Sequence, residues 1–282
     1  MKIAEIFYSI QGEGALLGAP SVFVRVSGCN LRCAWCDTPY ASWHPEGAEM
    51  ALPSILGDVL SYGCRHVVVT GGEPMIAPEI VPLTEELARA GLHITIETAG
   101  TVYAPVVCHL MSISPKLANS TPSEVPPQTG QGIHRGDAEI AEETQRRPEL
   151  FFSAMSLRPP RLCGESKLDS FAPSFQFQDS SGHWAAQHER RRIQPEILKR
   201  LMAACDYQLK FVVAGPEDLP EIKSLLEQIG ARDPARVILM PEGTDAAVLR
   251  ERSLWLVEIA KREGFRFSPR LHIDLYGNRQ GV

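Results

Sequence analysis

Hydrophobic and polar positions along the chain repeat in two ways that predict alternating strands and helices. Short runs rich in Val and Ile, of the length of buried strands, end in Gly or another turn residue. Between them, apolar residues recur with helical spacing, and most of these segments close on Gly. The strands are expected at 21–28, 65–72, 92–100, 106–116, 207–215, 236–243 and 266–277, and the helices at 52–63, 79–91, 194–205, 218–230 and 245–264. Such alternation is typical of an α/β domain with a mostly parallel sheet.

One long segment, residues 119–189, departs from this pattern. It is rich in Pro, Ser, Gln and Arg and carries only weak helical or apolar patterning. A connection of this length inside a compact domain is usually either a disordered insertion or a lid. Its composition favours disorder, so we expect a single domain over 1–282 that this insertion interrupts.

Length, composition and charge narrow the function classes. A chain of 282 residues with 44% hydrophobic content can bury one substantial core. The formal net charge of −6 argues against binding nucleic acid by phosphate neutralisation, so we expect small-molecule partners. The first residues lack the basic and apolar regions of a signal peptide, and no apolar run reaches the length of a membrane span. We therefore expect a cytosolic protein without membrane contact.

Three of the seven cysteines lie close together in the sequence. Cys29, Cys33 and Cys36 form a C-x₃-C-x₂-C motif directly after the strand expected at 21–28. Thiolates are the usual ligands of an iron–sulfur cluster. Three thiolates would hold three corners of a cubane cluster and leave its fourth iron open to another ligand.

The cysteines also allow less specific interpretations. The same three would complete a zinc site of the Cys₃His kind with His44 or His66, although no further ligands follow at matching spacing. The other cysteines are scattered, and a reducing compartment disfavours a disulfide framework. Each is interpreted as a small buried or incidental residue: Cys64, Cys108, Cys163 and Cys205.

Polar and Gly-rich motifs follow four of the expected strands. The three-cysteine motif, "TGGEP" at 70–74, "ETAGT" at 97–101 and "SPK" at 114–116 each come where a strand ends. Because the carboxyl ends of parallel strands meet at one edge of a sheet, these motifs should share a site. The two glycines of "TGGEP" would let the backbone approach a ligand closely, and Glu73 offers an acceptor for an ammonium group.

The combination of C-x₃-C-x₂-C after one strand and "GGEP" after the next resembles the radical S-adenosylmethionine (SAM) superfamily. The stretch "IFYSIQGEGALLGAPSVFVRVSGCNLRCAWCDTPYA" at 6–41 further resembles the amino-terminal region of the 7-carboxy-7-deazaguanine synthase family. Shorter similarities lie along the rest of the chain outside the insertion: "VVVTGGEPMI", "ITIETAGT", "SISPKLANS", "YQLKFVV" and "LHIDLYGN".

This resemblance implies an incomplete β/α barrel and a homodimer. It implies the conversion of 6-carboxy-5,6,7,8-tetrahydropterin to 7-carboxy-7-deazaguanine with loss of ammonia, in the biosynthesis of queuosine and related bases. A [4Fe–4S] cluster, SAM and Mg²⁺ would be the cofactors, and a flavodoxin or ferredoxin would donate electrons. In that superfamily, an electron from the cluster cleaves SAM to a 5′-deoxyadenosyl radical that takes a hydrogen atom from the substrate. The resemblance also implies that SAM is regenerated.

Residue roles follow from the positions that match this family. Cys29, Cys33 and Cys36 would hold the cluster, and the neutral hydroxyl of Thr38 would be a ligand of Mg²⁺. The matching SAM-binding positions are Trp35, Cys36, Asp37, Gly72, Ser114, Pro115 and Lys116. The matching substrate-binding positions are Ile10, Gln11, Gly12, Glu13, Arg25 and Thr70, with His272 near the chain end.

Arg25 interrupts the apolar run "VFVRVSG". A guanidinium on a buried strand needs an anionic partner. The substrate's carboxylate would serve, and an internal Asp or Glu is the alternative.

Two rival functions share part of the pattern. An activase that makes a glycyl radical on a protein partner has similar motifs, but it would not explain "IQGEG" or Thr38. A non-enzymatic zinc or iron–sulfur module would neither bind SAM nor cleave it. The agreement of several motifs favours the synthase.

Overall fold

A nine-stranded sheet organises residues 1–122 and 181–282, the part of the chain that the computed structural model describes. Its strands are β1 (Lys2–Ile10), β2 (Pro20–Val26), β3 (Ala48–Glu49), β4 (His66–Gly71), β5 (His93–Thr98), β6 (Leu110–Ile113), β7 (Tyr207–Val213), β8 (Val237–Pro241) and β9 (Arg266–Phe267). Their order in space is β3-β1-β2-β4-β5-β6-β7-β8-β9. From β2 to β9 along this order neighbouring strands pair in parallel, whereas β1 is antiparallel to both β2 and β3. The two end strands do not pair with each other, so the sheet forms an incomplete barrel, as expected.

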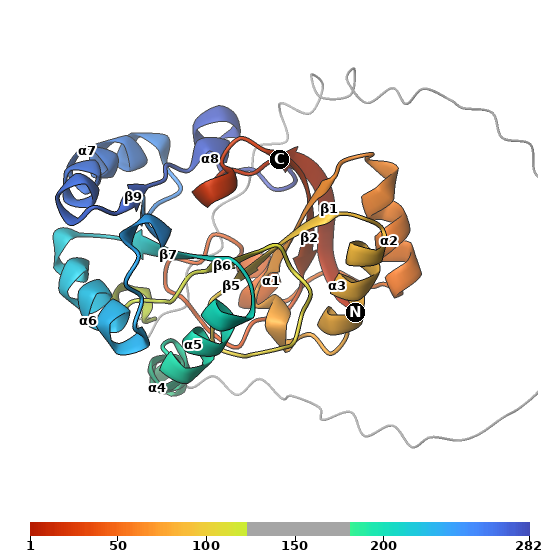
Figure 1. The fold of residues 1–282 in the computed structure, drawn as a ribbon, viewed down its shortest axis with the longest axis horizontal. Coiled ribbons are helices and arrows are strands. Elements are labelled where there is room, and N and C mark those ends of the chain that lie inside the picture. Colours follow the sequence, from red (N-terminus) through yellow and green to blue (C-terminus); the bar gives the residue numbers. More distant parts are fainter. Residues whose placement is uncertain (123–180) are drawn as a thin grey trace, which may run out of the picture. The chain divides into compact units, whose positions relative to one another are not determined.

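Helices connect the parallel strands. They are α1 (Pro39–Ser42), α2 (Leu52–Ser61), α3 (Ile80–Arg89), α4 (Ser181–Arg191), α5 (Pro195–Ala204), α6 (Leu219–Ile229), α7 (Ala246–Glu263) and α8 (Leu271–Tyr276). Figure 1 shows α2 and α3 beside β1 and β2, and α6 and α7 beside the last strands. Helices α6 and α7 stop at Gly230 and Gly264, whose φ angles of 70° and 73° suit glycine. Among the described residues, no helix has the length and apolar content needed to cross a membrane.

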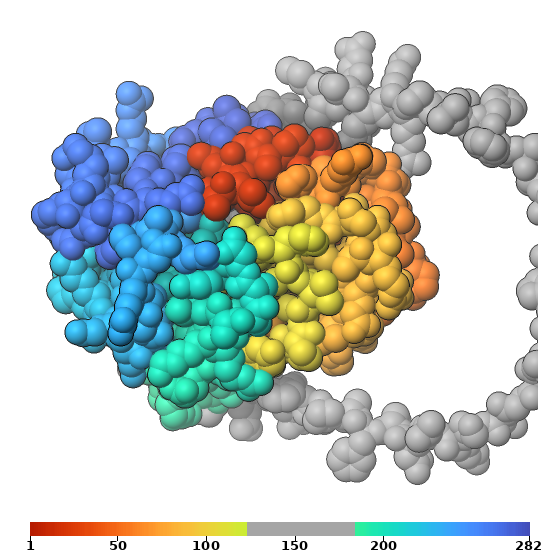
Figure 2. Space-filling view, viewed as in Figure 1, coloured from red at the N-terminus to blue at the C-terminus, as the bar shows by residue number. Residues whose placement is uncertain are grey.

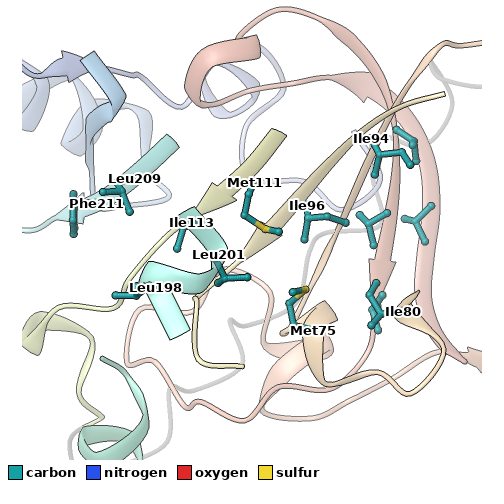
Figure 3. Packing of buried hydrophobic residues seen from close by; sticks show 14 of the residues in the cluster. Met75, Ile80, Ile94, Ile96, Met111, Ile113, Leu198, Leu201, Leu209 and Phe211 are labelled. Carbon is teal, nitrogen blue, oxygen red and sulfur yellow. The ribbon is translucent and has the colours of Figure 1, made fainter. Parts of the chain in front are cut away.

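The parallel strands have one apolar face and one polar face, because successive side chains point to opposite sides. The apolar face packs against the helices through residues such as Val69, Ile96, Ile113, Leu209 and Phe211. Figure 3 shows four of these side chains, together with two from α5: Ile96, Ile113, Leu209, Phe211, Leu198 and Leu201. The intervening positions carry the polar face: Thr70, Glu97, Ser112, Gln208 and Lys210. One side of the sheet therefore forms the core, and the other is available for chemistry.

The five predicted helices and the parallel strands are present, but other elements differ from expectation, among them the short α1 and β3, which were not predicted. Strand β1 was not predicted, because most of its residues are only partly buried and its apolar pattern is weak. The strand predicted at 266–277 is wrong, because β9 spans only two residues and α8 follows it. Pro269 cannot donate to a strand ladder and separates the two elements. Helix α4 was also missed, because its sequence has little apolar content.

Both ends of the predicted insertion contain packed residues. Ser120 Oγ lies 2.9 Å from Nε2 of His188, a buried residue of α4, although 68 positions separate the two in sequence. Arg192, just after α4, donates to the backbone oxygen of Lys116 at 3.1 Å. Ser120 and His188, near the two ends of the predicted insertion at 119–189, are therefore packed against each other. Residues 123–180 lie outside the described residues, and their disorder or role as a lid stays a prediction.

We predict that Leu201→Ala lowers the free energy of unfolding by about 2–5 kcal/mol, because the truncation leaves a cavity in the core. The side chain of Leu201 is 0% exposed, whereas Leu254 on α7 is 70% exposed. Leu254→Ala is the matched control, with an expected change of at most about 0.5 kcal/mol. Urea unfolding followed by circular dichroism measures both variants. Equal losses in the two would contradict this core.

Candidate active site

The three motif cysteines lie on the loop that follows the carboxyl end of β2. Cys33 is buried, Cys29 and Cys36 are half-buried, and all three pack in one small cluster with Leu31 and Ala99. Burial raises the pKa of Cys29 to about 12 and also raises the pKa values of Cys33 and Cys36. Such thiols stay protonated until a metal displaces the proton. Three thiols in one shared, mostly apolar environment fit the ligand set of a [4Fe–4S] cluster.

Hydrogen bonds from the protein hold this loop in place. Trp43 Nε1 donates to the backbone oxygen of Cys33 at 3.1 Å, and Ser42 Oγ lies 3.0 Å from Cys36 Sγ. The backbone nitrogen of Ala34 donates to the backbone oxygen of Ser120 at 2.9 Å. The protein itself therefore fixes the loop, through residues that the sequence analysis did not single out.

The glycines after β4 pack against the cysteine loop. Gly71 has φ of +139°, and a Cβ there would lie 2.0 Å from the backbone oxygen of Val26. A Cβ at Gly72 would lie 2.1 Å from the backbone oxygen of Gly28. Glycine is therefore required at both positions by the close approach of two backbone segments, in addition to any contact with a ligand.

Glu73 has a structural role within the protein. Its carboxylate accepts hydrogen bonds from Thr98 Oγ1 at 2.7 Å, from the backbone nitrogen of Ala99 at 2.8 Å and from that of Met75 at 3.1 Å. The residue is 0% exposed and ties the "GGEP" turn to the carboxyl end of β5. The expectation that Glu73 accepts from the ammonium group of a ligand stays a prediction.

Four of the predicted SAM-binding residues lie close together: Trp35 on the cysteine loop, and Ser114, Pro115 and Lys116 just after β6. Lys116 Nζ donates to Ser114 Oγ at 3.0 Å and lies 5.5 Å from the centre of the Trp35 ring. Trp35 Nε1 donates to the backbone oxygen of Asn119 at 3.0 Å. Pro115, which lies between Ser114 and Lys116 in the sequence, is buried. The structure thus places an aromatic face, a hydroxyl and an ammonium group side by side, close to the loop that carries the cysteines.

A carboxylate that the sequence analysis did not assign lies on the polar face of the sheet. Oε1 of Glu97 accepts from Gln11 Nε2 at 3.1 Å, and Oε2 accepts from Thr70 Oγ1 at 2.9 Å. Gln11 and Thr70 are both buried and were both predicted to bind substrate. These donors are neutral, and Glu97 makes no ion pair within the described residues, but its charge helps to raise the pKa of the nearby Lys210. Its position at the start of "ETAGT", directly after an apolar strand, was a signal that could have identified it.

A chain of ion pairs lies beside this carboxylate. Glu13 pairs with Lys210 of β7 and with Arg270, whose Nε lies 3.0 Å from the Glu13 carboxylate. Arg270 also pairs with Asp37. Burial alone would raise the pKa of Glu13, but the charges of Lys210 and Arg270 outweigh it and hold that pKa well below its ordinary value. Arg270 likewise outweighs burial at Asp37 and lowers its pKa. Glu13 and Asp37, predicted for two different ligands, are thus linked by an arginine that the sequence analysis missed.

The carboxy-terminal segment joins the site through His272. The backbone nitrogen of Leu271 donates to the backbone oxygen of Gly12 at 3.0 Å, and a Cβ at Gly12 would lie 2.0 Å from His272 Nδ1. Figure 2 shows the amino-terminal segment, in red, against the carboxy-terminal residues, in blue. Burial lowers the pKa of His272, which favours the neutral imidazole near pH 7. His272 therefore lies beside the predicted substrate-binding segment, which begins at Ile10, the last residue of β1.

Arg25 has an internal acidic partner. Its Nε donates to Glu5 Oε1 at 2.6 Å, and the hydroxyl of Tyr40 donates to the same oxygen at 2.7 Å. The predicted alternative, in which an internal carboxylate pairs with Arg25, is thus confirmed for its Nε atom. Within residues 1–122 and 181–282, the two terminal guanidinium nitrogens make no hydrogen bond.

Thr38 and His66 bear on the predicted metal sites. Thr38 Oγ1 lies 3.9 Å from Cys36 Sγ, at the start of α1. His66 begins β4 and stacks on His93, with 4.8 Å between ring centres, at the opposite end of the strand from the cysteine loop. The zinc site completed by His66 is therefore wrong, and His44, the other candidate, is exposed. The role of Thr38 as a magnesium ligand stays a prediction.

Comparisons with known proteins agree with this geometry. The model of the Radical SAM superfamily matches residues 23–114. A 7-carboxy-7-deazaguanine synthase from Halobacterium salinarum is 39% identical, over 99% of this chain and 91% of its own. A 7-carboxy-7-deazaguanine synthase from Rhodopirellula baltica is also 39% identical, over 100% of this chain and 89% of its own.

The fold has a counterpart among solved structures. The crystal structure of QueE from Escherichia coli aligns over 96% of this chain and 94% of its own, with a TM-score of 0.55 and 23% identity. That likeness concerns the fold, whereas the two relatives share sequence along almost their whole length. The chain therefore belongs to the 7-carboxy-7-deazaguanine synthase family of the radical SAM superfamily.

Proposed function

We propose that this protein converts 6-carboxy-5,6,7,8-tetrahydropterin to 7-carboxy-7-deazaguanine with loss of ammonia, in the biosynthesis of queuosine and related bases. The observation that carries the proposal is the occurrence of a three-thiol loop together with a polar cluster of Glu97, Gln11 and Thr70 on the sheet. The sequence identity to two synthases over nearly the whole chain supports the same reaction. Neither a glycyl-radical activase nor a non-enzymatic module accounts for that similarity.

The cysteine loop would serve the radical chemistry. Cys29, Cys33 and Cys36 would hold a [4Fe–4S] cluster that, with SAM, supplies the 5′-deoxyadenosyl radical that takes a hydrogen atom from the substrate. Lys116 would donate to a hydroxyl or carboxylate of SAM, because its ammonium group has three donors and only one is used by Ser114. Burial of the cysteines keeps water away from this region.

The polar cluster of Glu97, Gln11 and Thr70 would bind the pterin. A carboxylate only accepts hydrogen bonds, and the amino and ring N–H groups of a pterin donate them, so Glu97 suits that edge. Gln11 and Thr70 hold the two oxygens of Glu97 in position. Glu5 binds Arg25 through Nε, which leaves the terminal nitrogens of Arg25 for the substrate's carboxylate.

Other parts of the proposal rest on the family. Thr38 would be a ligand of Mg²⁺, whose remaining ligands would come from substrate oxygen and water. The protein would act as a homodimer in the cytosol and receive electrons from a flavodoxin or ferredoxin.

The reaction is tested with the full-length protein, reconstituted with iron and sulfide without oxygen, then reduced. With SAM, Mg²⁺ and the carboxypterin, we expect 7-carboxy-7-deazaguanine, identified by mass and ultraviolet absorbance. Cys33→Ala should abolish both product and 5′-deoxyadenosine, because a cluster short of one thiolate does not assemble properly. Cys64→Ala, at a half-buried cysteine outside the motif, should stay active. Turnover in Cys33→Ala would reject the assignment of the cluster ligands. Formation of 5′-deoxyadenosine without consumption of the pterin would reject the proposed substrate.

Glu97→Gln keeps the size of the side chain and removes its charge. We expect KM for the pterin to rise about 10–100-fold, because a hydrogen bond to a charged group contributes about 1.5–3 kcal/mol. Glu196→Gln is the control, since the side chain of Glu196 on α5 is 82% exposed. Steady-state kinetics of product formation measure both variants. An unchanged KM in Glu97→Gln would exclude Glu97 as a substrate contact.

Glu13→Gln leaves buried Lys210 and Arg270 without their shared carboxylate, so we expect a loss of about 3–5 kcal/mol in the free energy of unfolding at neutral pH. The pKa of Glu13 is lower in the folded chain than in the unfolded chain. Its stabilisation is therefore complete above the unfolded pKa of about 4.3 and is lost as the pH falls further.

The difference in the free energy of unfolding between wild type and Glu13→Gln should consequently be constant from about pH 7 to about pH 5 and shrink below that, as urea unfolding would show. Glu258→Gln is the control, because the side chain of Glu258 is 66% exposed. A difference that grows on acidification would contradict the ion-pair chain.

A further inference from the structure

Two cysteines that are far apart in sequence are neighbours in the fold. Cys108 Sγ and Cys205 Sγ lie 2.8 Å apart, although 97 positions separate them in the chain. Both thiols are free and half-buried. An S–S bond is about 2.05 Å long, so a small movement of the side chains would bring the sulfurs to bonding distance. Cys108 and Cys205, which are scattered singly in the sequence, are thus a pair in the fold.

The backbone around this pair is fixed by strand pairing. Cys108 comes just before β6 and Cys205 just before β7, and these neighbouring strands are parallel. The backbone nitrogen of Met111 donates to the backbone oxygen of Asp206 at 2.8 Å. The backbone nitrogen of His109 donates to the backbone oxygen of Ile94, also at 2.8 Å. The two sulfurs therefore stay close as long as β6 and β7 remain paired.

We propose that Cys108 and Cys205 form a reversible disulfide, which small-molecule disulfides such as oxidised glutathione close and small thiols reopen. Nothing in the proposed reaction uses these residues. They lie at the amino ends of their strands, whereas the cysteine loop and Ser114 to Lys116 lie at the carboxyl ends. The site is thus separate from the chemistry of the cluster and the pterin.

The first step of closure uses Cys205. Its hydrogen bond with Cys108 lowers the pKa of Cys205 and raises that of Cys108. Cys205 is therefore the better nucleophile of the two. Its thiolate attacks one sulfur of the small disulfide, breaks the S–S bond, forms a mixed disulfide and expels one small thiolate, which takes up a proton from water.

The second step uses Cys108. Its thiol loses a proton to water and attacks Sγ of Cys205, which forms the internal S–S bond and expels the second small thiol. The two cysteines together lose two electrons, and the small disulfide gains them in becoming two thiols. Excess small thiol reverses both steps.

A bond here would join β6 to β7. The other end of β6 leads to Ser114 and Lys116, and β7 carries Lys210. The bond would also close a loop of the chain that contains residues 123–180, which restricts the unfolded state. The expected effect is therefore a protein that resists unfolding more strongly when oxidised, with its site residues unchanged.

The test uses the full-length protein with its cluster reconstituted, so that the motif cysteines are ligated. The protein is equilibrated without oxygen in glutathione buffers of rising oxidised fraction, alkylated, digested without reduction and mapped by mass spectrometry. We expect peptides joined through Cys108 and Cys205 that separate on addition of dithiothreitol. Cys64, a half-buried cysteine before β4, is the internal control and should be alkylated throughout.

Serine variants test the order of the two steps. Cys108→Ser should remove the cross-link and accumulate glutathione on Cys205, because the serine hydroxyl can still donate to the thiolate. Cys205→Ser should remove the cross-link and leave Cys108 mostly unmodified. More glutathione on Cys108 than on Cys205 would reject the assignment of Cys205 as the nucleophile.

A second measurement does not depend on peptide mapping. Oxidation should raise the Tm of the wild type by about 5 °C or more, because the bond closes a long loop, and should leave the Tm of Cys108→Ser unchanged. The proposal is overturned if both thiols are alkylated in the most oxidising buffer, or if they carry glutathione without a cross-link. A cross-link of either residue to Cys163 instead would equally reject it.

Discussion

The polar face of the sheet sets the main physical constraint on this protein. Charged groups removed from water are costly unless they are paired or hydrogen-bonded. Glu13, Lys210, Arg270 and Asp37 meet this requirement among themselves, and the pairs draw the amino-terminal loop and the carboxy-terminal segment onto the sheet. Glu97 accepts hydrogen bonds only from neutral donors, and Lys210 is a nearby cation on which its negative charge acts.

The position of the cysteine loop depends on close packing between backbone segments. Its backbone lies against Gly71 and Gly72, where any side chain would collide, and the buried carboxylate of Glu73 holds that turn to β5. The site is therefore largely formed before any ligand arrives. Preorganisation of this kind lowers the cost of ordering the site when a ligand binds.

Sequence patterns predicted the features that depend on residues close together in the chain. The helical and strand periods gave the alternation, and the spacing of Cys29, Cys33 and Cys36 gave the cluster loop. Lys210 and Arg270 were missed because a single cation in a short segment does not reveal its partner. The neighbours Cys108 and Cys205 could not be paired from sequence, since only the pairing of β6 and β7 brings them together. Helix α8 was mistaken for a strand because a short apolar run fits both periods.

The ion pair between Glu13 and Arg270 spans 257 positions of the chain. During synthesis the first strands and the cysteine loop leave the ribosome long before Arg270 exists. Contacts between the two ends of a chain must form late, since they wait for the last residues and carry the largest loop-closure cost. The ion pairs that join the two ends of the chain are thus completed in the last stage of folding, after the sheet that carries them.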